Sequence, residues 1–315
     1  MAKNETSACQ TACTRKTSIG GQALIEGIMM KGPDRSAMAI RKPDGTIELK
    51  DWPTKKPHGL GKVPFVRGIF NFIDTLLQGY KCLMDSAEMA GQEEEPTKFE
   101  IWLDKKFGNA TGKLFSFIVT VLALILCVGL FVVIPSSLTS LLSQHLKSDI
   151  LLSLIEGVIK MAIFLAYIIG VSNLEDIKRT FMYHGAEHKT IFCYEHEEEL
   201  TVENVRKQIR FHPRCGTSFL LIVVIISILV SSLITWESVF LRAAIKILLL
   251  PVTVGISYEL IKFAGRHDNT LTRIISAPGL WLQRFTTKEP DDSMIEVAIT
   301  AFTAALPEDP EKDQW

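Results

Sequence analysis

Two short motifs contain the residues best suited to binding a metal ion. The first is His184-Gly-Ala-Glu187-His188, in which the two histidines are four residues apart. On a helix this spacing places both imidazoles on one face, where they can reach one divalent ion. Glu187 stands beside His188 as in the H-x-x-E-H arrangement of inverted zinc proteases. The motif therefore predicts a metal site with Glu187 as the candidate catalytic residue.

The second motif, His212-Pro-Arg-Cys215-Gly, follows in the same polar segment. Its two-residue gap is typical of a zinc knuckle, in which a tight turn directs two ligands at one ion. Together the two motifs offer up to four ligands, and a mixture of imidazole and thiolate favours zinc, with other divalent metals as alternatives. We therefore predict a shared zinc site in residues 184–216.

The sequence leaves two arrangements of this site open. In a closed site, the two histidines of the first motif and both residues of the second surround zinc, and Glu187 only orients a ligand. In an open site, three protein ligands leave a position for water and Glu187 acts as general base. Inverted zinc proteases take a carboxylate ligand from well downstream, and Glu259 lies 71 residues after His188. Further candidate ligands are Cys193, His267 and Asp268.

The elements that must position these motifs are strongly apolar. The chain is 47% hydrophobic, and its apolar residues are concentrated in runs at 114–134, 150–171, 217–235 and about 240–262. Each run is close to the roughly 20 residues that a membrane-spanning helix needs. The first and third runs contain no charged residue. We therefore predict a mainly α, polytopic membrane protein with about four transmembrane helices.

Loop charge predicts the orientation. The loop 135–149 contains one basic residue, Lys147, whereas 172–216 contains Lys178, Arg179, Lys189, Arg206, Lys207, Arg210 and Arg214. By the positive-inside rule, the metal-motif loop and both termini are cytoplasmic. Residues 1–18 lack the apolar core of a secretory signal. The six cysteines suit a reducing compartment, where thiols and metal ligation prevail over disulfides.

The chain is expected to fall into consecutive segments of different character. They are a disordered tail (1–18), a small β-containing cytoplasmic unit (19–58), an amphipathic helix and linker (59–113), transmembrane helices 1 and 2 (114–171), the cytoplasmic metal-motif loop (172–216), transmembrane helices 3 and 4 (217–264), and C-terminal cytoplasmic helices with an acidic tail (265–315). In the β unit, the turn Pro43-Asp44-Gly45 joins two short strands. The amphipathic helix has apolar positions from Val66 to Met84. This pattern suits a helix on the membrane surface as well as one packed on the spans.

Three strings of the sequence resemble the YqhQ-like family of bacterial membrane proteins. They are Gly20-Gly-Gln-Ala-Leu-Ile-Glu-Gly-Ile-Met-Met30, Tyr183-His-Gly-Ala-Glu-His-Lys-Thr190 and His212-Pro-Arg-Cys-Gly-Thr-Ser-Phe219. The resemblance covers nearly the whole chain past the tail. The family carries a general label of predicted metal-dependent enzyme without a substrate. The resemblance therefore implies a location in the bacterial inner membrane and supports a metal site.

Three hypotheses of function follow. The first is an integral membrane zinc protein with a cytoplasm-facing site, a candidate hydrolase acting on a lipid or protein at the membrane. The alternative is a non-enzymatic scaffold or regulator in which zinc folds the loop. The third is a transporter, because Glu156 and Lys160 lie four residues apart within the second apolar run. The expected partners are membrane lipids and a membrane protein, and no nucleic acid.

Overall fold

The protein was analysed as a computed structural model that describes residues 15–56, 59–91, 111–146, 148–232, 239–267 and 269–313. The chain divides into two compact units. Unit 1 comprises Met1–Gly91, Ile168–Val223 and Pro251–Trp315, and unit 2 comprises Gln92–Tyr167 and Val224–Leu250. Both metal motifs belong to unit 1, so its architecture positions the candidate site.

Unit 1 is built on a four-stranded antiparallel sheet. Its strands follow the sequence in the order β1 (Gly20–Leu24), β2 (Gly27–Lys31), β3 (Arg35–Arg41) and β4 (Ile47–Pro53). The predicted turn between β3 and β4 is present, with Gly45 at a φ of 85°. The turn between β1 and β2 holds Glu26 at a φ of 52°, which is uncommon for a residue other than glycine. The small N-terminal β unit expected from the sequence is therefore confirmed as a four-stranded meander.

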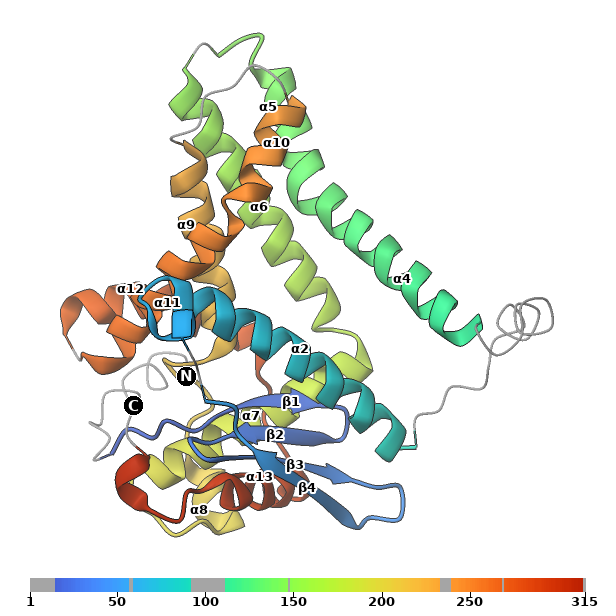
Figure 1. Ribbon diagram of the computed structural model, residues 1–315, viewed down its shortest axis with the longest axis vertical. Coiled ribbons are helices and arrows are strands. Elements are labelled where there is room, and N and C mark those ends of the chain that lie inside the picture. Colours follow the sequence, from blue (N-terminus) through green and yellow to red (C-terminus); the bar gives the residue numbers. More distant parts are fainter. Residues whose placement is uncertain are drawn as a thin grey trace. The chain divides into compact units, whose positions relative to one another are not determined.

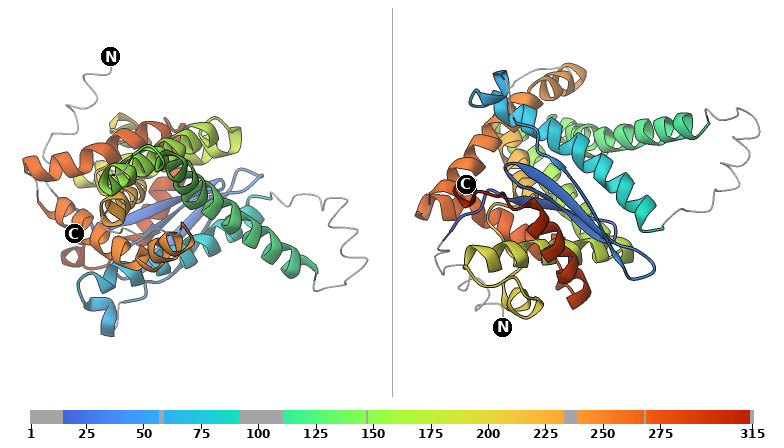
Figure 2. Two further views of the ribbon diagram at one scale, coloured as in Figure 1. Left: turned by 90° about the horizontal axis from the view of Figure 1, so that it is seen from above. Right: turned by 60° about the horizontal axis from the view of Figure 1, so that its bottom comes forward.

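Helices cover both faces of this sheet (Figure 1). Along β2, Ile28 and Met30 pack with α7 (Glu175–Glu195) and α13 (Asp292–Ala305), while Met29 belongs to a second core that includes Cys82 of α2 (Val66–Met89). This division follows from the period of two in a strand, which sends successive side chains to opposite faces. Figure 2 (right) shows α2 on one side of the sheet and α7 with α13 on the other.

The remaining elements of unit 1 are short or come from distant parts of the chain. They are η1 (Gly59–Lys62), α8 (Val202–Lys207), the first turns of α9 (Gly216–Ser232), α11 (Leu250–Arg266), α12 (Thr270–Thr286) and η4 (Pro310–Lys312). Asn269 caps α12 in a reciprocal capping box with Thr272. Asp291 caps α13 by accepting a hydrogen bond from the Met294 amide. The neighbouring Ser293 does not cap the helix, because its hydroxyl donates to Asp291.

Unit 2 contains the longest apolar helices. They are α4 (Thr111–Val128), the π-helical turn η3 (Gly129–Val133), α5 (Ile134–Leu142), α6 (Asp149–Val171), the second part of α9, and α10 (Val239–Leu248). Two stretches among the described residues, Phe117–Leu142 and Ile150–Val171, are long and apolar enough to cross a membrane. The π-helical turn directly precedes Pro135, whose missing N–H breaks the regular hydrogen-bond pattern.

The four predicted spans differ in how the structure forms them. The first extends beyond residue 134 to Leu142, and the second matches Ile150–Val171. The third is α9, which is described over the 17 residues Gly216–Ser232, while residues 233–235 of the predicted run lie outside the described part of the chain. The fourth consists of two helices, because α10 ends at Leu248 and α11 begins at Leu250. The structure therefore supports a mainly helical protein, with two candidate membrane helices in the part of the chain that it describes.

Candidate metal centre

Helix α7 carries the first motif and is the most buried helix around the site. It begins with Glu175 and Asp176, whose negative charges favour a helix N-terminus. Its central residues from Tyr183 to Cys193 are all buried. The rings of His184 and His188 lie side by side with centroids 4.4 Å apart. The predicted shared face of the two histidines is therefore confirmed.

Cys215 of the second motif joins these two histidines. It lies directly before α9, and its Sγ is 3.2 Å from His184 Nε2. One potential ligand atom from each of His184, His188 and Cys215 lies within 4.8 Å of the other two. All three residues are buried. Two imidazoles and one thiolate at this separation form a donor set that suits zinc.

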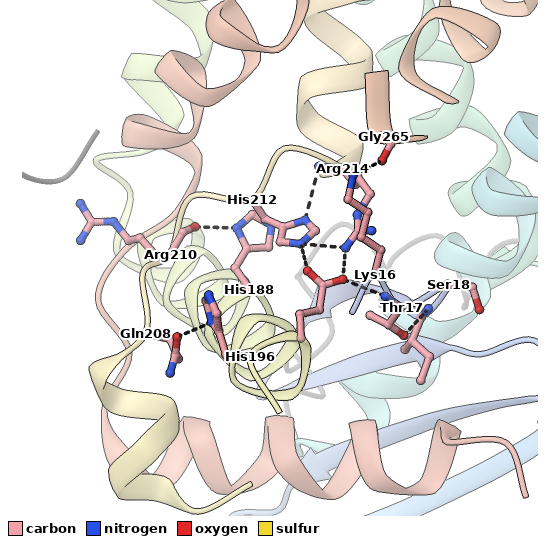
Figure 3. A network of polar contacts seen from close by, with 12 residues as sticks. Lys16, Thr17, Ser18, His188, His196, Gln208, Arg210, His212, Arg214 and Gly265 are labelled. Atoms are coloured by element: carbon pink, nitrogen blue, oxygen red, sulfur yellow. Dashed lines mark hydrogen bonds and ion pairs between the residues drawn. The ribbon is translucent and has the colours of Figure 1, made fainter. Parts of the chain in front are cut away.

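The outer nitrogens of both histidines are held by backbone carbonyls. His184 Nδ1 is 2.8 Å from the carbonyl oxygen of Thr286. His188 Nδ1 is 2.6 Å from the carbonyl oxygen of Arg210 (Figure 3). A carbonyl can only accept, so each Nδ1 carries the proton and donates. With Nδ1 bound to a carbonyl, Nε2 is the nitrogen of each ring left to bind a metal ion, as in the carbonyl–histidine–metal arrangement of known metal sites.

The inner nitrogen of His188 has no hydrogen-bond partner among the described residues, although it is buried. Leaving a buried polar atom unpaired costs about 1–3 kcal/mol, so such atoms are rare in native proteins. A metal ion between His188 Nε2 and the Cys215 sulfur satisfies this nitrogen. The residues present therefore fit a bound metal.

The charges of this group follow from burial and from its neighbours. Burial alone raises the pKa of the Cys215 thiol, but the nearby His184 and His188 outweigh it and hold that pKa well below its usual value. For His184, burial opposes protonation, yet the facing Cys215 raises its pKa to about 9. In the metal-free protein, the thiolate and imidazolium form an ion pair. A metal ion competes with one proton for this site.

Glu187 points from α7 toward strand β1. Its Oε1 accepts a hydrogen bond from the Gly21 amide at 3.0 Å, while its Oε2 is buried without a hydrogen-bond partner among the described residues. Burial is the main cause that raises the pKa of this carboxyl group. A β-carbon on Gly21 would lie 2.9 Å from Glu187 Cδ, so this approach requires glycine. Gly21 of β1 thus belongs to the site.

His212, the other residue of the second motif, belongs to a different network. Its Nε2 is 3.5 Å from a carboxylate oxygen of Glu195. Its backbone amide donates a hydrogen bond to the side-chain oxygen of Gln283, and its backbone carbonyl accepts one from the side-chain nitrogen of Gln283. Arg214 pairs with the same Glu195. Figure 3 shows the side chains of His212 and Arg214 close to one another. Burial lowers the pKa of His212 to about 4. His212 is therefore a neutral, hydrogen-bonded core residue outside the ligand group, contrary to the expectation from spacing.

The Glu195 carboxylate is the centre of that network. Burial raises its pKa, but the hydrogen bond from His212 and the charge of Arg214 outweigh burial and lower it to about 2. Glu195 also accepts a hydrogen bond from the amide of Thr17 at 2.9 Å. The network therefore ties the segment before β1 to α7 and to the turn that carries Cys215.

The other candidate ligands lie away from the cluster. Glu259 forms an ion pair with Arg67 and accepts a hydrogen bond from the Phe65 amide at 3.1 Å, so the structure places it outside the ligand group. The Cys193 thiol donates to backbone carbonyls of the following turn, and His267 bonds the Phe263 carbonyl. Asp268 and Lys147 lie outside the described residues. In unit 2, buried Glu156 accepts a hydrogen bond from Ser136 at 3.0 Å.

Comparison with known proteins places this geometry in a family. Residues 63–308 match the family described as "Protein of unknown function (DUF1385)". The chain is also 37% identical over 294 residues to "Uncharacterized protein YqhQ" of Bacillus subtilis (strain 168). The aligned residues cover 91% of this chain and 92% of that protein. The chain belongs to this family. No solved structure matches the chain. The family carries no established activity, so the site residues themselves must support the function.

Sequence reasoning missed two kinds of residue at the site. The carbonyls of Thr286 and Arg210 cannot be recognised from residue type, because any residue supplies a carbonyl. Gly185, in contrast, could have been recognised from the sequence, because it is a glycine within the first motif. A β-carbon there would collide with the carbonyl oxygen of Lys288, so only glycine lets the segment before α13 pass close to α7.

Proposed function

We propose that this protein is an integral membrane metalloenzyme, a zinc-dependent hydrolase whose site faces the cytoplasm and acts on a lipid or protein at the membrane. The observation that carries the proposal is the common arrangement of His184 and His188. Each donates Nδ1–H to a carbonyl and directs Nε2 toward Cys215, and the Nε2 of His188 is buried without a hydrogen-bond partner among the described residues.

The placement of His212 favours the open arrangement over the closed one. A closed structural site needs four protein ligands, and the hydrogen bond to Glu195 holds His212 outside the group. Three ligands leave a position for a water molecule or a substrate oxygen. Zinc bound there supplies Lewis-acid chemistry, which activates water and polarises a carbonyl or phosphoryl oxygen.

Glu187 has the environment of a general base. The Gly21 amide fixes Oε1, which leaves Oε2 as the atom able to accept a proton from water. The ordered carboxylate lies next to the two histidine ligands along α7. Gly21 is a positioning residue in this account, because its amide orients Glu187 and its missing side chain lets α7 approach.

The membrane part of the proposal rests on the apolar helices and on the basic residues of the loops between them. Phe117–Leu142 and Ile150–Val171 have the length and composition of spanning helices. Helix α9 is shorter but contains no charged residue. We propose that α9 and the α10–α11 pair complete a multi-pass protein of the bacterial inner membrane, with both termini and the metal centre in the cytoplasm, as the basic residues of 172–216 indicate.

Metal content and complementation test this proposal together. Wild-type protein purified without chelators is expected to contain about one zinc ion per chain, and His188→Ala and Cys215→Ala are expected to contain almost none. His267→Ala removes an exposed histidine away from the cluster and serves as the matched control. A wild-type chain that neither contains nor takes up a divalent metal contradicts the proposal.

Glu187→Gln separates catalysis from a structural metal. This variant keeps the shape and the hydrogen bond from Gly21 but loses the base, so it is expected to retain zinc and to fail to complement a deletion strain. Full complementation by Glu187→Gln, with failure of His188→Ala, shows instead a scaffold or regulator in which zinc stabilises the fold.

A further inference from the structure

Helix α2 shows an inverted pattern of burial. Its buried residues are small, namely Gly68, Gly79, Cys82 and Ser86. Its large apolar side chains are exposed instead: Phe70, Ile73, Leu76, Leu77, Tyr80, Leu83 and Met84. These residues recur every three or four positions and therefore form one stripe along the outer face. Leu77 alone is 69% exposed. A stripe of this size on a soluble surface normally marks a site of association.

Helix α12 shows the same inversion. It buries Thr272, Ser276, Gly279 and Gln283, while Leu271, Ile274 and Trp281 are exposed. Small and polar residues thus face the protein on two separate helices, and apolar residues face away. An exposed tryptophan and tyrosine on such helices are typical of the interface between lipid and water.

Both helices contact the start of α9. The ring of Phe72 in α2 lies 5.9 Å from that of Phe219, and Gly279 of α12 packs directly on Ser218. Helix α9 then continues without a charged residue to Ser232. If α9 enters the membrane, as proposed above, its first turn lies at the bilayer surface. The outward faces of α2 and α12 then lie at the depth of the lipid headgroups.

A groove beside α2 is lined by lysine side chains. A cavity of about 730 Å³ lies between α2 and β4, and Trp52, Leu77, Lys50, Lys55 and Lys81 are among its lining residues. Among the described residues, these three lysines have no carboxylate within ion-pair distance. Two of the three lining aspartates are already paired, Asp51 with Arg35 and Asp74 with Lys31. The third aspartate, Asp85, offsets one of the three lysine charges, so the groove has a net positive charge next to an apolar stripe.

We propose that α2 and α12 lie in the headgroup region of the bilayer, and that the groove between α2 and β4 binds the phosphate of an anionic phospholipid. The three lysines attract the phosphate, and Trp52 and Leu77 contact the adjoining acyl chains. This inference rests on the membrane part of the proposed function and is independent of the metal. It assigns this face of unit 1 to lipid.

Tryptophan quenching tests the inference on the full-length protein. The chain is reconstituted into lipid nanodiscs that contain either phosphatidylglycerol or phosphatidylcholine brominated on the acyl chains. The contribution of Trp52 is the difference in quenching between wild type and Trp52→Phe, and Trp281→Phe gives that of Trp281. We expect both contributions to be quenched, with Trp52 quenched at a lower fraction of phosphatidylglycerol than of phosphatidylcholine.

Charge variants test the selectivity. The substitution Lys50→Gln/Lys55→Gln/Lys81→Gln is expected to reduce the preference for phosphatidylglycerol by on the order of 100-fold, since each lysine near an anionic surface contributes about fivefold. The control Lys42→Gln/Lys207→Gln/Lys312→Gln removes the same charge from lysines that are paired elsewhere, and should keep the preference. Circular dichroism and zinc content verify that both variants are folded.

Each other outcome contradicts a defined part of the inference. If bromination of either lipid leaves the Trp52 and Trp281 contributions unchanged, protein covers these faces and the inference is wrong. If both lipids quench Trp52 equally, the groove does not select an anionic headgroup. Failure of the chain to enter nanodiscs contradicts the membrane part of the proposed function, whereas loss of zinc alone contradicts only its metal part.

Discussion

Two buried polar clusters lie close together in unit 1, and they differ in how their hydrogen bonds are used. In the His184–His188–Cys215 cluster, the inner nitrogen of His188 is buried without a hydrogen-bond partner among the described residues. In the network around Glu195, the ring of His212 is satisfied by a carboxylate and its backbone by a glutamine side chain. Cys215 of the first cluster and His212 of the second come from the same motif. A metal-ligating histidine is therefore told apart from a structural one by a ring nitrogen without a hydrogen-bond partner, and not by residue type.

The comparison is tested most strongly by removing one sulfur and one imidazole. Cys215→Ser is expected to lower zinc content from about one ion per chain to nearly zero, because the hydroxyl remains protonated and is a poor ligand. His212→Gln removes an imidazole from the same turn but is expected to retain zinc. Metal analysis of the two variants, purified side by side, decides this. Equal loss from both variants means that the two clusters form one site.

The Glu195 network predicts a large effect on stability. Glu195→Ala leaves the buried Arg214 guanidinium without its carboxylate, and breaking a buried pair in this way costs about 3–5 kcal/mol. The midpoint of thermal unfolding in detergent should therefore fall by many degrees. Glu203→Ala, which breaks the exposed pair with Lys207, is the control and should change the midpoint little. An unchanged midpoint in Glu195→Ala contradicts a structural role for the network.

Gly185 predicts a smaller but local effect. In Gly185→Ala, the new methyl group meets the Lys288 carbonyl, so the segment before α13 must shift, at a cost of about 1–3 kcal/mol. Because α12 ends beside this segment at the carbonyl that orients His184, zinc affinity should fall along with stability. Gly216→Ala, where no atom lies within 4 Å of the added carbon, is the matched control. Wild-type behaviour of Gly185→Ala contradicts the close approach.

The smallest predicted effect concerns pH. The pKa of His212 is lowered from 6.5 to about 4, so between these values the unfolded chain binds a proton that the folded chain does not. Stability therefore falls as the pH is lowered from about 6.5 toward 4. The unfolding midpoint should drop by a few °C between pH 7 and pH 5, and by less in His212→Gln. The same slope in both proteins rules out His212 as its source.

The sequence predicted the parts of the site that local spacing controls. The four-residue interval between His184 and His188 defined their shared helical face, and the apolar runs defined the two long helices. His212 was assigned from its two-residue gap to Cys215, which resembles a knuckle, whereas in the structure it is hydrogen-bonded to Glu195 and Gln283 from other segments. Glu259 was assigned by distance along the chain, whereas Arg67 from a distant segment binds it. Long-range contacts of this kind are set by tertiary packing.

The fold shows the same division between local and long-range information. The turn at Asp44 and Gly45 follows from residue type, and so does the amphipathic pattern of α2. Residue type does not predict which way the apolar stripe of α2 faces, since the apolar stripe of a soluble helix normally faces the core. The structure reverses this expectation by burying Gly68 and Gly79. The fourth apolar run was predicted as one helix although it contains Pro251, and the structure divides it at Leu249, two residues before this proline.

X-ray absorption at the zinc edge on purified wild-type protein tests the central claim most directly. The account predicts a zinc ion with one sulfur neighbour at about 2.3 Å and imidazole nitrogens at about 2.0–2.1 Å, with the remaining position taken by oxygen. The sulfur contribution should disappear from any zinc that Cys215→Ser retains. A zinc shell without sulfur, or a protein that binds no zinc, contradicts the account.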